Sequence, residues 1–466
     1  MRRLVKVFFF IMILGSFSFF TVVVHAENNL PAADMVSAPP VLVLSLEKSL
    51  ERALENYPKL RGASAGIDAA KFQREEANAL FWPKLEYKYR AAPVPSDVSN
   101  ALGSFFDGNI TMFNSFHTNV IIPLTTFGQL KIAQDLADGG IEAAKYYKQK
   151  EELNLVYEVK RLYFGLQYAH EVIRLIQDAA KKVNDKIESE EEKDTPDIAP
   201  TDLIRLKLFK VELEKRLLEA IENQALATDG FRFYLQLPDE QVFQLSTRNL
   251  NPTSARLEAF ESYIERAALQ TEPDAKLLAI GVETKKRQLK LEKYKRLPKA
   301  GIGLFYEVGG TTSTVTGVAN TDDYSNPFNY QRGGVGFQLS GDIDFHASNA
   351  KIQKAKAEML KASFDQMEAK KGLEIRAKKA FLFAKRSKEN YLAADKAKSL
   401  ARQAVFLEKS NQDIGVGDQD KYAEVLQTLL LKRGEYLKSV YDYNLALADL
   451  ERTVAVSLKQ IQQGEQ

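Results

Sequence analysis

The stretch that decides the fold is residues 128–189, GQLKIAQDLADGGIEAAKYYKQKEELNLVYEVKRLYFGLQYAHEVIRLIQDAAKKVNDKIES, which contains no proline. Its apolar residues recur at alternating steps of three and four: Leu155, Val156, Val159, Leu162, Tyr163, Leu166, Ala169, Val172, Ile173, Ile176 and Ala180. This spacing predicts one helix with a coiled-coil seam, about 90 Å long, with Gly139–Gly140 as its weak point. Such a helix is either a solvated spacer or one wall of a long structure.

The first 26 residues predict an exported protein. Arg2, Arg3 and Lys6 precede an uncharged apolar run, which Ala26 ends in a small residue suited to signal peptidase. These features are typical of a secretory signal peptide over residues 1–26, with an uncleaved membrane anchor as the alternative. After this segment, no apolar run approaches the ~20 residues of a membrane-spanning helix. A membrane role therefore requires β-strands.

Composition excludes several classes of function. The chain of 466 residues has no cysteine, so it has no disulfide, thiol nucleophile, Cys-ligated zinc or lipid-modified cysteine. Its net charge is +2. Because the signal carries three basic residues and no acidic one, the mature chain is close to −1. That balance gives no argument for binding nucleic acid.

The first half of the mature chain starts with a flexible segment over residues 27–43. A helix follows from Ser45, its predicted N-cap, to Trp82, with a break at Tyr57–Pro58. Trp82 is either an anchor at a membrane interface or a packed core residue.

The hydrophobic period then changes from helical to two. Charged residues (Lys84, Glu86, Lys88 and Arg90) alternate with apolar ones (Leu85, Tyr87, Tyr89 and Ala91). This pattern predicts a strand with one apolar and one charged face. It fits a half-buried strand of a soluble sheet, or a barrel strand with aromatic residues toward lipid and charges toward a watery lumen.

The remaining elements of this half are two strands and a helical hairpin. We predict strands at about 84–92 and 115–122, a loop over 93–114, and long helices over about 128–189 and 201–236. Thr201 or Asp202 is the expected N-cap of the second long helix.

The second half repeats this order. Three pairs of landmarks have nearly one offset: Pro83 and Pro298 (215 residues), Asp197 and Asp413 (216), and Phe127 and Phe345 (218). We therefore predict a duplicated unit of helix–strand–strand–long helix–long helix, over residues 44–256 and 257–460, with a C-terminal tail at 461–466. The second unit has a helix over about 257–296, strands at about 300–308 and 333–340, and long helices over about 348–410 and 418–458.

Four strands cannot close a barrel, and an open sheet in lipid would leave its edges unpaired. Transmembrane strands therefore require oligomerisation, and a trimer would supply twelve strands. The predicted fold is mainly α with a transmembrane β-barrel: a trimeric, 12-stranded barrel that continues into a long periplasmic α-helical tunnel.

Five motifs give the chain a resemblance to the TolC-type outer-membrane efflux proteins, or outer membrane factors, over essentially all of the mature sequence. They are LSLEKSLERALENYP (44–58), FWPKL (81–85), IPLTTFG (122–128), DIGVGDQDKYAEVL (413–426) and YDYNLALADL (441–450). The resemblance implies a homotrimeric channel in the outer membrane of a Gram-negative bacterium, without a lipid anchor. It implies a passive conduit for efflux or type I secretion, partnered by a periplasmic adaptor and an inner-membrane transporter of RND or ABC type.

The resemblance also implies two sites near the tips of the helical hairpins. Adaptor docking falls on Asp197, Ile198, Ala199, Pro200 and Thr201, and on Ile414, Gly415, Val416 and Gly417. A tunnel constriction falls on Glu424 and Gln427, with Asp420 and Asp418 as possible substitutes. Acidic rings there would favour cations, but carboxylates also occur in first helical turns for their favourable interaction with the helix dipole. Gln427 departs from the family's acidic type.

No catalytic or cofactor site is predicted. His25, His117, His170 and His346 lack the spacing of metal ligands. The glycine pairs near 301–303 and 333–336 lie in predicted strands and not at strand-to-helix turns, so they are poor phosphate loops. The alternative function is a soluble periplasmic coiled-coil protein with a structural or chaperone-like role, which would have no need of two strand pairs.

Overall fold

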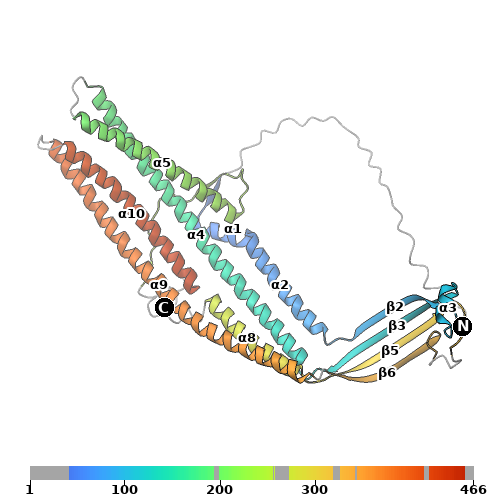
Figure 1. Cartoon of the computed structure of the whole chain (residues 1–466). Coiled ribbons are helices and arrows are strands. Elements are labelled where there is room, and N and C mark those ends of the chain that lie inside the picture. Colours follow the sequence, from blue (N-terminus) through green and yellow to red (C-terminus); the bar gives the residue numbers. More distant parts are fainter. Residues whose placement is uncertain are drawn as a thin grey trace, which may run out of the picture.

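The computed structural model describes residues 41–193, 199–255, 257, 272–318, 326–341, 344–413 and 419–456. In them, long helices form an extended layer and a four-stranded sheet continues from one end of it (Figure 1). The helices are α1 (Leu46–Asn56), α2 (Pro58–Ala79), α3 (Ala101–Phe106), α4 (Gln129–Glu191), α5 (Pro200–Leu235), α8 (Pro273–Tyr294), α9 (Phe345–Asp413) and α10 (Gln419–Val454). The strands are β1 (Leu42–Leu44), β2 (Lys84–Pro95), β3 (Ile110–Thr125), β4 (Phe243–Leu245), β5 (Lys299–Thr311) and β6 (Tyr330–Ser340). The predicted signal peptide, the tail at 461–466 and residues 258–271 lie outside the described residues.

Helix α4 is the central element, with 63 residues. It starts after Gly128, whose φ of 91° is a left-handed conformation that glycine adopts without a Cβ penalty. It passes through Gly139–Gly140 without a break. Seven of the eleven predicted seam residues are buried: Leu155, Val159, Leu162, Tyr163, Leu166, Ala169 and Ile176. The other four, Val156, Val172, Ile173 and Ala180, are partly buried.

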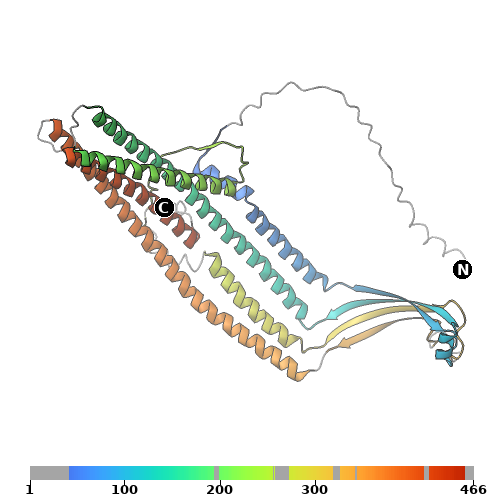
Figure 2. The same ribbon diagram turned by 45° about the horizontal axis from the view of Figure 1, so that its top comes forward.

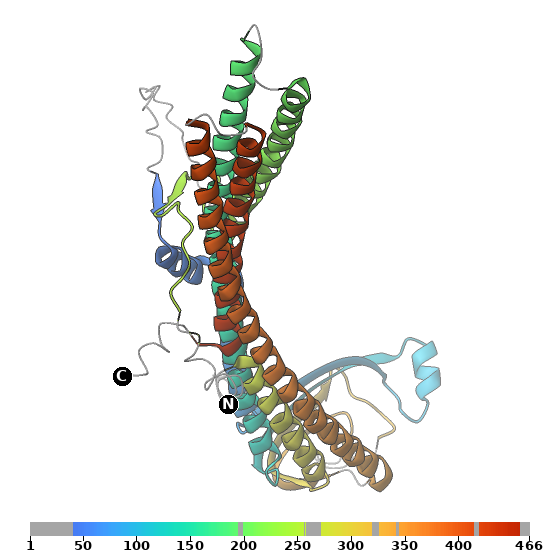
Figure 3. The same cartoon turned by 90° about the vertical axis from the view of Figure 1, so that its left-hand side faces the viewer.

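The helices lie side by side in a single layer. Near the sheet the order is α2, α4, α8 and α9 (Figure 2). Farther from it, α4 contacts both α5 and α10, and α10 contacts α9. Seen edge on, the layer is thin, and α1 with the small β1–β4 sheet lies against one side of it (Figure 3). A single layer leaves much of each helix uncovered, so large apolar residues of α5 stay exposed: Ile204, Leu208, Val211 and Leu218.

The cores of this layer form between adjacent helices. One cluster joins α4 to α5 and α1 through the fully buried Val159, Phe231, Leu235 and Ala53. A second joins α9 to α10 through Ala377, Ala384 and Leu447. Burying a side chain of the size of Phe or Leu stabilises by about 1.5–3 kcal/mol. These contacts therefore hold the long hairpins together.

The large sheet is antiparallel throughout, in the order β2-β3-β5-β6. β3 pairs with β5, so the central pairing joins strands that lie far apart in the sequence. When the short elements α3 and β4 are set aside, the order helix–strand–strand–helix–helix occurs twice along the described chain, as α2–β2–β3–α4–α5 and α8–β5–β6–α9–α10.

The predicted loop over 93–114 is wrong. β2 extends to Pro95, a short helix spans Ala101–Phe106, and β3 already begins at Ile110. Pro93 and Pro95 led to the prediction of a loop, because proline is unfavourable inside a sheet. Proline is tolerated on an edge strand, and β2 includes both residues. β2 has its only partner, among the described strands, on the β3 side.

Two further expectations need correction near the chain's first helices. The segment predicted as flexible up to residue 43 ends in a strand, since Leu42–Leu44 pairs in parallel with Phe243–Leu245. Thr201 and Asp202 do not cap α5, because Ala199 is the N-cap and Pro200 takes the first helical position. Ser45 does cap α1, accepting a hydrogen bond from the backbone N–H of Lys48 at 3.2 Å.

Candidate channel wall

The large sheet has two chemically different faces. Side chains alternate between faces along each strand, and directly paired residues of antiparallel neighbours share a face. The register of the sheet therefore assigns its paired residues to one face or the other. We call them the apolar face and the charged face.

The apolar face carries no charged residue of the four strands, and ten of its large side chains are 37–73% exposed in the chain. They are Leu85, Tyr87 and Tyr89 of β2, Phe116 of β3, Leu304, Tyr306 and Val308 of β5, and Val335, Phe337 and Leu339 of β6. The alternation that the sequence predicts in β2, β5 and β6 is thus present, and the register aligns it across all four strands. An exposed apolar surface of this kind marks a contact with a partner or with lipid.

The charged face carries every charged residue of the four strands. They are Lys84, Glu86, Lys88, Arg90, Lys299, Glu307 and Arg332. Five are basic and two are acidic, which gives the face a net charge of +3. All the charged residues of the four strands lie on this face, although Ile121 and Phe305 lie on it too. The charged face therefore suits water and the opposite, uncharged face suits hydrocarbon.

One row of polar residues crosses the charged face from strand to strand. Lys88 pairs with His117, His117 with Glu307, and Glu307 with Arg332. Arg332 donates from Nε to Glu307 Oε2 at 2.8 Å, and His117 Nδ1 lies 2.5 Å from Glu307 Oε1. His117 and Glu307 are half-buried, so the row ties three strands together on the side that is rich in charge.

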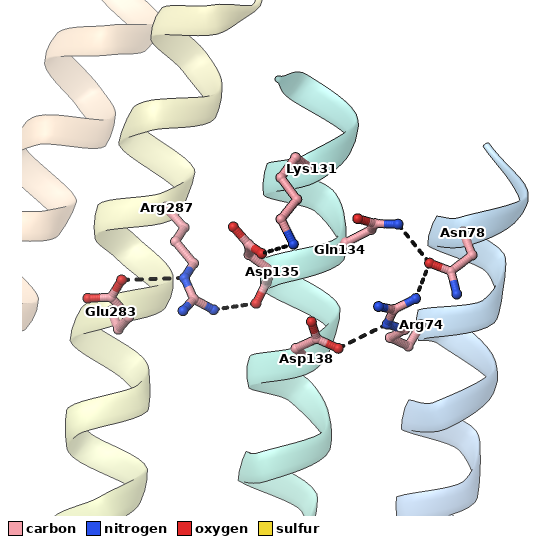
Figure 4. A network of polar contacts seen from close by, with 8 residues as sticks. All are labelled: Arg74, Asn78, Lys131, Gln134, Asp135, Asp138, Glu283 and Arg287. Carbon is pink, nitrogen blue, oxygen red and sulfur yellow. Dashed lines mark hydrogen bonds and ion pairs between the residues drawn. The ribbon is translucent and has the colours of Figure 1, made fainter. Parts of the chain in front are cut away.

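Polar contacts also connect the helices near the sheet. Arg74 of α2 forms an ion pair with Asp138 of α4 at 3.0 Å, and Gln134 of α4 donates to Asn78 of α2 at 2.8 Å (Figure 4). On the other side of α4, Arg287 of α8 donates to the backbone carbonyl of Asp135. Asp135 also pairs with Lys131 of its own helix, and Arg287 with Glu283 of its own. Because these partners lie on three adjacent helices, they fix the lateral order α2, α4, α8.

A second polar cluster lies midway along the helical layer. Asp274 of α8 accepts from Lys150 of α4 at 2.7 Å and lies 3.4 Å from Arg376 of α9, which also pairs with Glu272. A polar pocket of about 200 Å³ opens among these side chains. Burial lowers the pKa of Arg376, and the nearby charge of Arg452 lowers it further. The cluster joins helices of both halves of the chain where α8 begins.

The predicted docking and constriction residues lie at the far end from the sheet. Of the docking residues, Ala199, Pro200 and Thr201 are described, and all three are exposed at the start of α5. Lys207 of α5 pairs with Glu191 of α4 at 2.6 Å, which closes the base of this tip. Asp197, Ile198 and the second tip (Ile414, Gly415, Val416 and Gly417) lie outside the described residues.

Of the predicted constriction residues, Glu424 and Gln427 lie in the first turns of α10, and both side chains are exposed. Asp418 and the side chain of Asp420 lie outside the described residues. Because Glu424 and Gln427 are three residues apart in one helix, they lie on nearly the same side of α10.

Trp82 is 73% exposed, so it is not a packed core residue of this chain. It lies in the turn between α2 and β2, next to the sheet.

The described residues hold no group of three or more His, Cys, Asp or Glu side chains arranged to hold a metal ion. Among the helices of this part of the chain, none combines the length and the apolar character needed to cross a membrane.

The fold is that of solved outer-membrane channels. The channel CmeC of Campylobacter jejuni superposes with a TM-score of 0.72 at 16% identity, covering 90% of this chain and 89% of that one. The open-state channel MtrE of Neisseria gonorrhoeae gives 0.70 at 15% identity, covering 89% of each chain. The outer membrane protein VceC of Vibrio cholerae gives 0.69 at 14% identity, covering 89% and 96%. At such identities the likeness shows the fold alone.

A sequence comparison with known protein families gives one match. Residues 49–193 match the family model described as outer membrane efflux protein. These residues therefore belong to that family, and the rest of the described chain continues the channel fold. The predicted resemblance to outer-membrane efflux proteins is thus confirmed for residues 49–193. No curated protein sequence matches the chain.

Proposed function

We propose that this chain is the outer-membrane channel of a tripartite efflux or type I secretion system and acts as a passive, homotrimeric conduit. The observation that carries the proposal is the sheet with two faces, one exposed and apolar, the other carrying all the charge. A soluble sheet would bury its apolar face in a core. In a membrane the same face lies against lipid and the charged face lines water. A soluble periplasmic spacer gives no reason for this arrangement.

The edges of the sheet support the trimer. β2 and β6 are the outer strands of the described sheet, and each pairs on one side only. Unpaired backbone N–H and C=O groups are not tolerated in hydrocarbon, and four strands are too few to close a barrel. Three chains would close twelve strands, with β6 of one chain pairing with β2 of the next.

The helical layer extends the same argument beyond the membrane. The exposed apolar residues of α5 need a neighbour, and the adjacent chain of a trimer supplies one. Three curved layers side by side would continue the barrel as a water-filled tunnel through the periplasm. The twofold occurrence of one element order supports an origin by duplication, with repeats over about 44–256 and 257–460.

The tips of this tunnel are the proposed contact with the periplasmic adaptor, and through it the inner-membrane transporter of RND or ABC type. The exposed residues Ala199, Pro200 and Thr201 would form part of that surface, together with 197–198 and 414–417. Glu424 and Gln427 would line the narrowest point, aided by Asp418 and Asp420.

Engineered disulfides test the trimer directly, because the natural chain has no cysteine. Tyr89→Cys is combined in one chain with Val335→Cys, Phe337→Cys or Leu339→Cys, all on the apolar face of the two edge strands. Oxidation of membranes should give a covalent trimer in at least one combination. The control combines Tyr89→Cys with Gln338→Cys on the opposite face and should stay unlinked. Linked dimers alone, or no linkage in any combination, would contradict the closed trimer.

The constriction has its own test. In planar bilayers, Glu424→Gln should lower the preference of the channel for cations and Gln427→Glu should raise it, because each change alters the carboxylates at the narrow point. Two variants that both conduct like the parent protein would place the constriction elsewhere.

A further inference from the structure

We infer that the lumen of the barrel favours anionic solutes, and that Lys88 and Arg90 of β2 are the residues that set this preference. The inference rests on the proposed function, since it takes the charged face of the sheet as the lining of a trimeric barrel. It concerns the membrane-spanning part of the channel and not the tips of the helices.

The excess of positive charge is the first observation. The charged face has five basic and two acidic residues, so three chains would bring a net +9 to one water-filled space. The mature chain as a whole is close to electrically neutral. The positive charge is therefore concentrated on this face and does not reflect overall composition.

The pattern of ion pairs is the second observation. Both acidic residues of the face are paired: Glu86 lies 2.9 Å from Lys84, and Glu307 binds Arg332 at 2.8 Å with His117 beside it. Lys88 and Arg90 are exposed, and among the described residues neither has an ion-pair partner. The charges left without compensation are thus basic.

The position of these two residues makes their charge effective. Lys88 belongs to the polar row with His117, Glu307 and Arg332, and Arg90 pairs with Ser115 in the next row of the same face. Each side chain would occur three times around the lumen. The low dielectric constant of the surrounding protein and lipid concentrates the field of such charges in the water of the pore.

The chemistry of the favoured solutes follows. Lysine and arginine donate several hydrogen bonds and accept none, so they attract carboxylate, phosphate and sulfonate groups. A guanidinium group binds such groups in a bidentate manner. Small anions and anionic groups of larger cargo would be enriched in the barrel, and cations would be depleted.

Reversal potentials measured with purified trimers in planar bilayers test the inference. A KCl gradient is applied at concentrations near 0.1 M, where the Debye length is about 10 Å. The measurement is repeated near 1 M, where the Debye length is about 3 Å. The double variant Lys88→Gln/Arg90→Gln should lower the chloride-to-potassium permeability ratio by about twofold or more at low salt, and by much less at high salt.

Two controls fix the cause. Lys88→Arg keeps the charge and should leave the permeability ratio unchanged. Glu86→Gln removes a negative charge from the same strand and face, and should shift the ratio toward chloride. If the double variant forms trimers that conduct with the parent's permeability ratio, the basic lumen is wrong while the channel stands. If trimers of the parent protein give no conductance, the proposed channel fails and the inference fails with it.

Discussion

Lys160 of α4 forms an ion pair with Glu451 of α10, and only 17% and 11% of the two side chains are exposed. The contact joins the long helix of the first half of the chain to the last helix of the second half. Two charges at this depth lose most of their hydration, and their mutual attraction offsets part of that loss.

Replacing one partner should therefore lower the free energy of unfolding more than replacing both. Lys160→Met leaves a carboxylate without its lysine partner, and we expect a loss of about 3 kcal/mol in the free energy of unfolding. Lys160→Met/Glu451→Met should recover most of it, because apolar groups of similar size need no charged partner. Circular dichroism in detergent, followed through a urea titration, measures the change.

A surface pair provides the control for this prediction. Lys71 and Asp68 of α2 are 2.8 Å apart, but more than half of each side chain is exposed. Lys71→Met should change the unfolding free energy by less than about 1 kcal/mol. A Lys160→Met protein as stable as Lys71→Met would show that the α4–α10 contact carries no net energy.

The contact between α8 and α9 gives a dependence on pH. Lys285 donates to Glu358 at 3.0 Å, and this hydrogen bond, with the lysine's charge, holds the pKa of Glu358 below its usual 4.5. Because the folded-state pKa is depressed, the stabilisation is complete above 4.5 and is lost as the pH falls through the folded value. More than a third of each side chain is exposed, so solvent screens the contact and the effect is small.

Glu358→Gln isolates this contribution. The difference in melting temperature between parent and variant should be constant above about pH 5.5 and should vanish as the pH is lowered past the folded pKa. Glu368→Gln, which removes a carboxylate of the same helix that has no ion pair among the described residues, is the control. A parent–Glu358→Gln difference that grew at low pH would reverse the expected sign.

Local patterns made much of this architecture predictable. The three-and-four spacing of α4 and the alternation in β2 each depend on neighbouring residues, and both elements are present. The predicted ends of the strands were less accurate where two sequence signals competed. Pro93 and Pro95 suggested the end of a strand, but β2 continues through both. Proline has no N–H group to donate, and an edge strand tolerates this because it pairs on one side only.

Pairings over long distances in the sequence were not predictable. Glu307 lies 190 residues after His117, and nothing in either strand specifies that the two residues meet. The β1–β4 pair was missed for the same reason, because each strand has only three residues and no alternation to detect. The row of Lys88, His117, Glu307 and Arg332 could therefore be identified only from the register of the sheet.

Two adjacent glycines of α4 differ in their surroundings and should differ in their response to substitution. A Cβ at Gly140 would meet nothing within 4 Å, whereas one at Gly139 would lie 3.5 Å from Nη1 of Arg287 on α8. Gly140→Ala should stabilise by about 0.5–1 kcal/mol, through helix propensity and a less flexible unfolded chain. Gly139→Leu should destabilise by about 1–3 kcal/mol, because its branched side chain would force α8 away from α4.

The same urea titration measures both variants. Gly139→Ala serves as the intermediate case, since 3.5 Å is an ordinary van der Waals distance and a methyl group fits. Gly140→Leu is the matched control for Gly139→Leu. Equal changes in the free energy of unfolding for these two variants would mean that α8 does not approach α4 at Gly139.

The orientation of the sheet in the membrane can be tested at two adjacent residues of β6. Val335 lies on the apolar face and is 72% exposed, while Gly336 lies on the charged face, where an added Cβ meets nothing within 4 Å. Val335→Arg would place a guanidinium group against lipid, at a cost of roughly 2–4 kcal/mol per chain near the bilayer midplane. Gly336→Arg would place the same group in the watery lumen near Arg332. We expect Val335→Arg to lower the yield of SDS-resistant trimers in outer-membrane fractions, and Gly336→Arg to assemble like the parent. The reverse order of yields would mean that the charged face, and not the apolar one, lies against lipid.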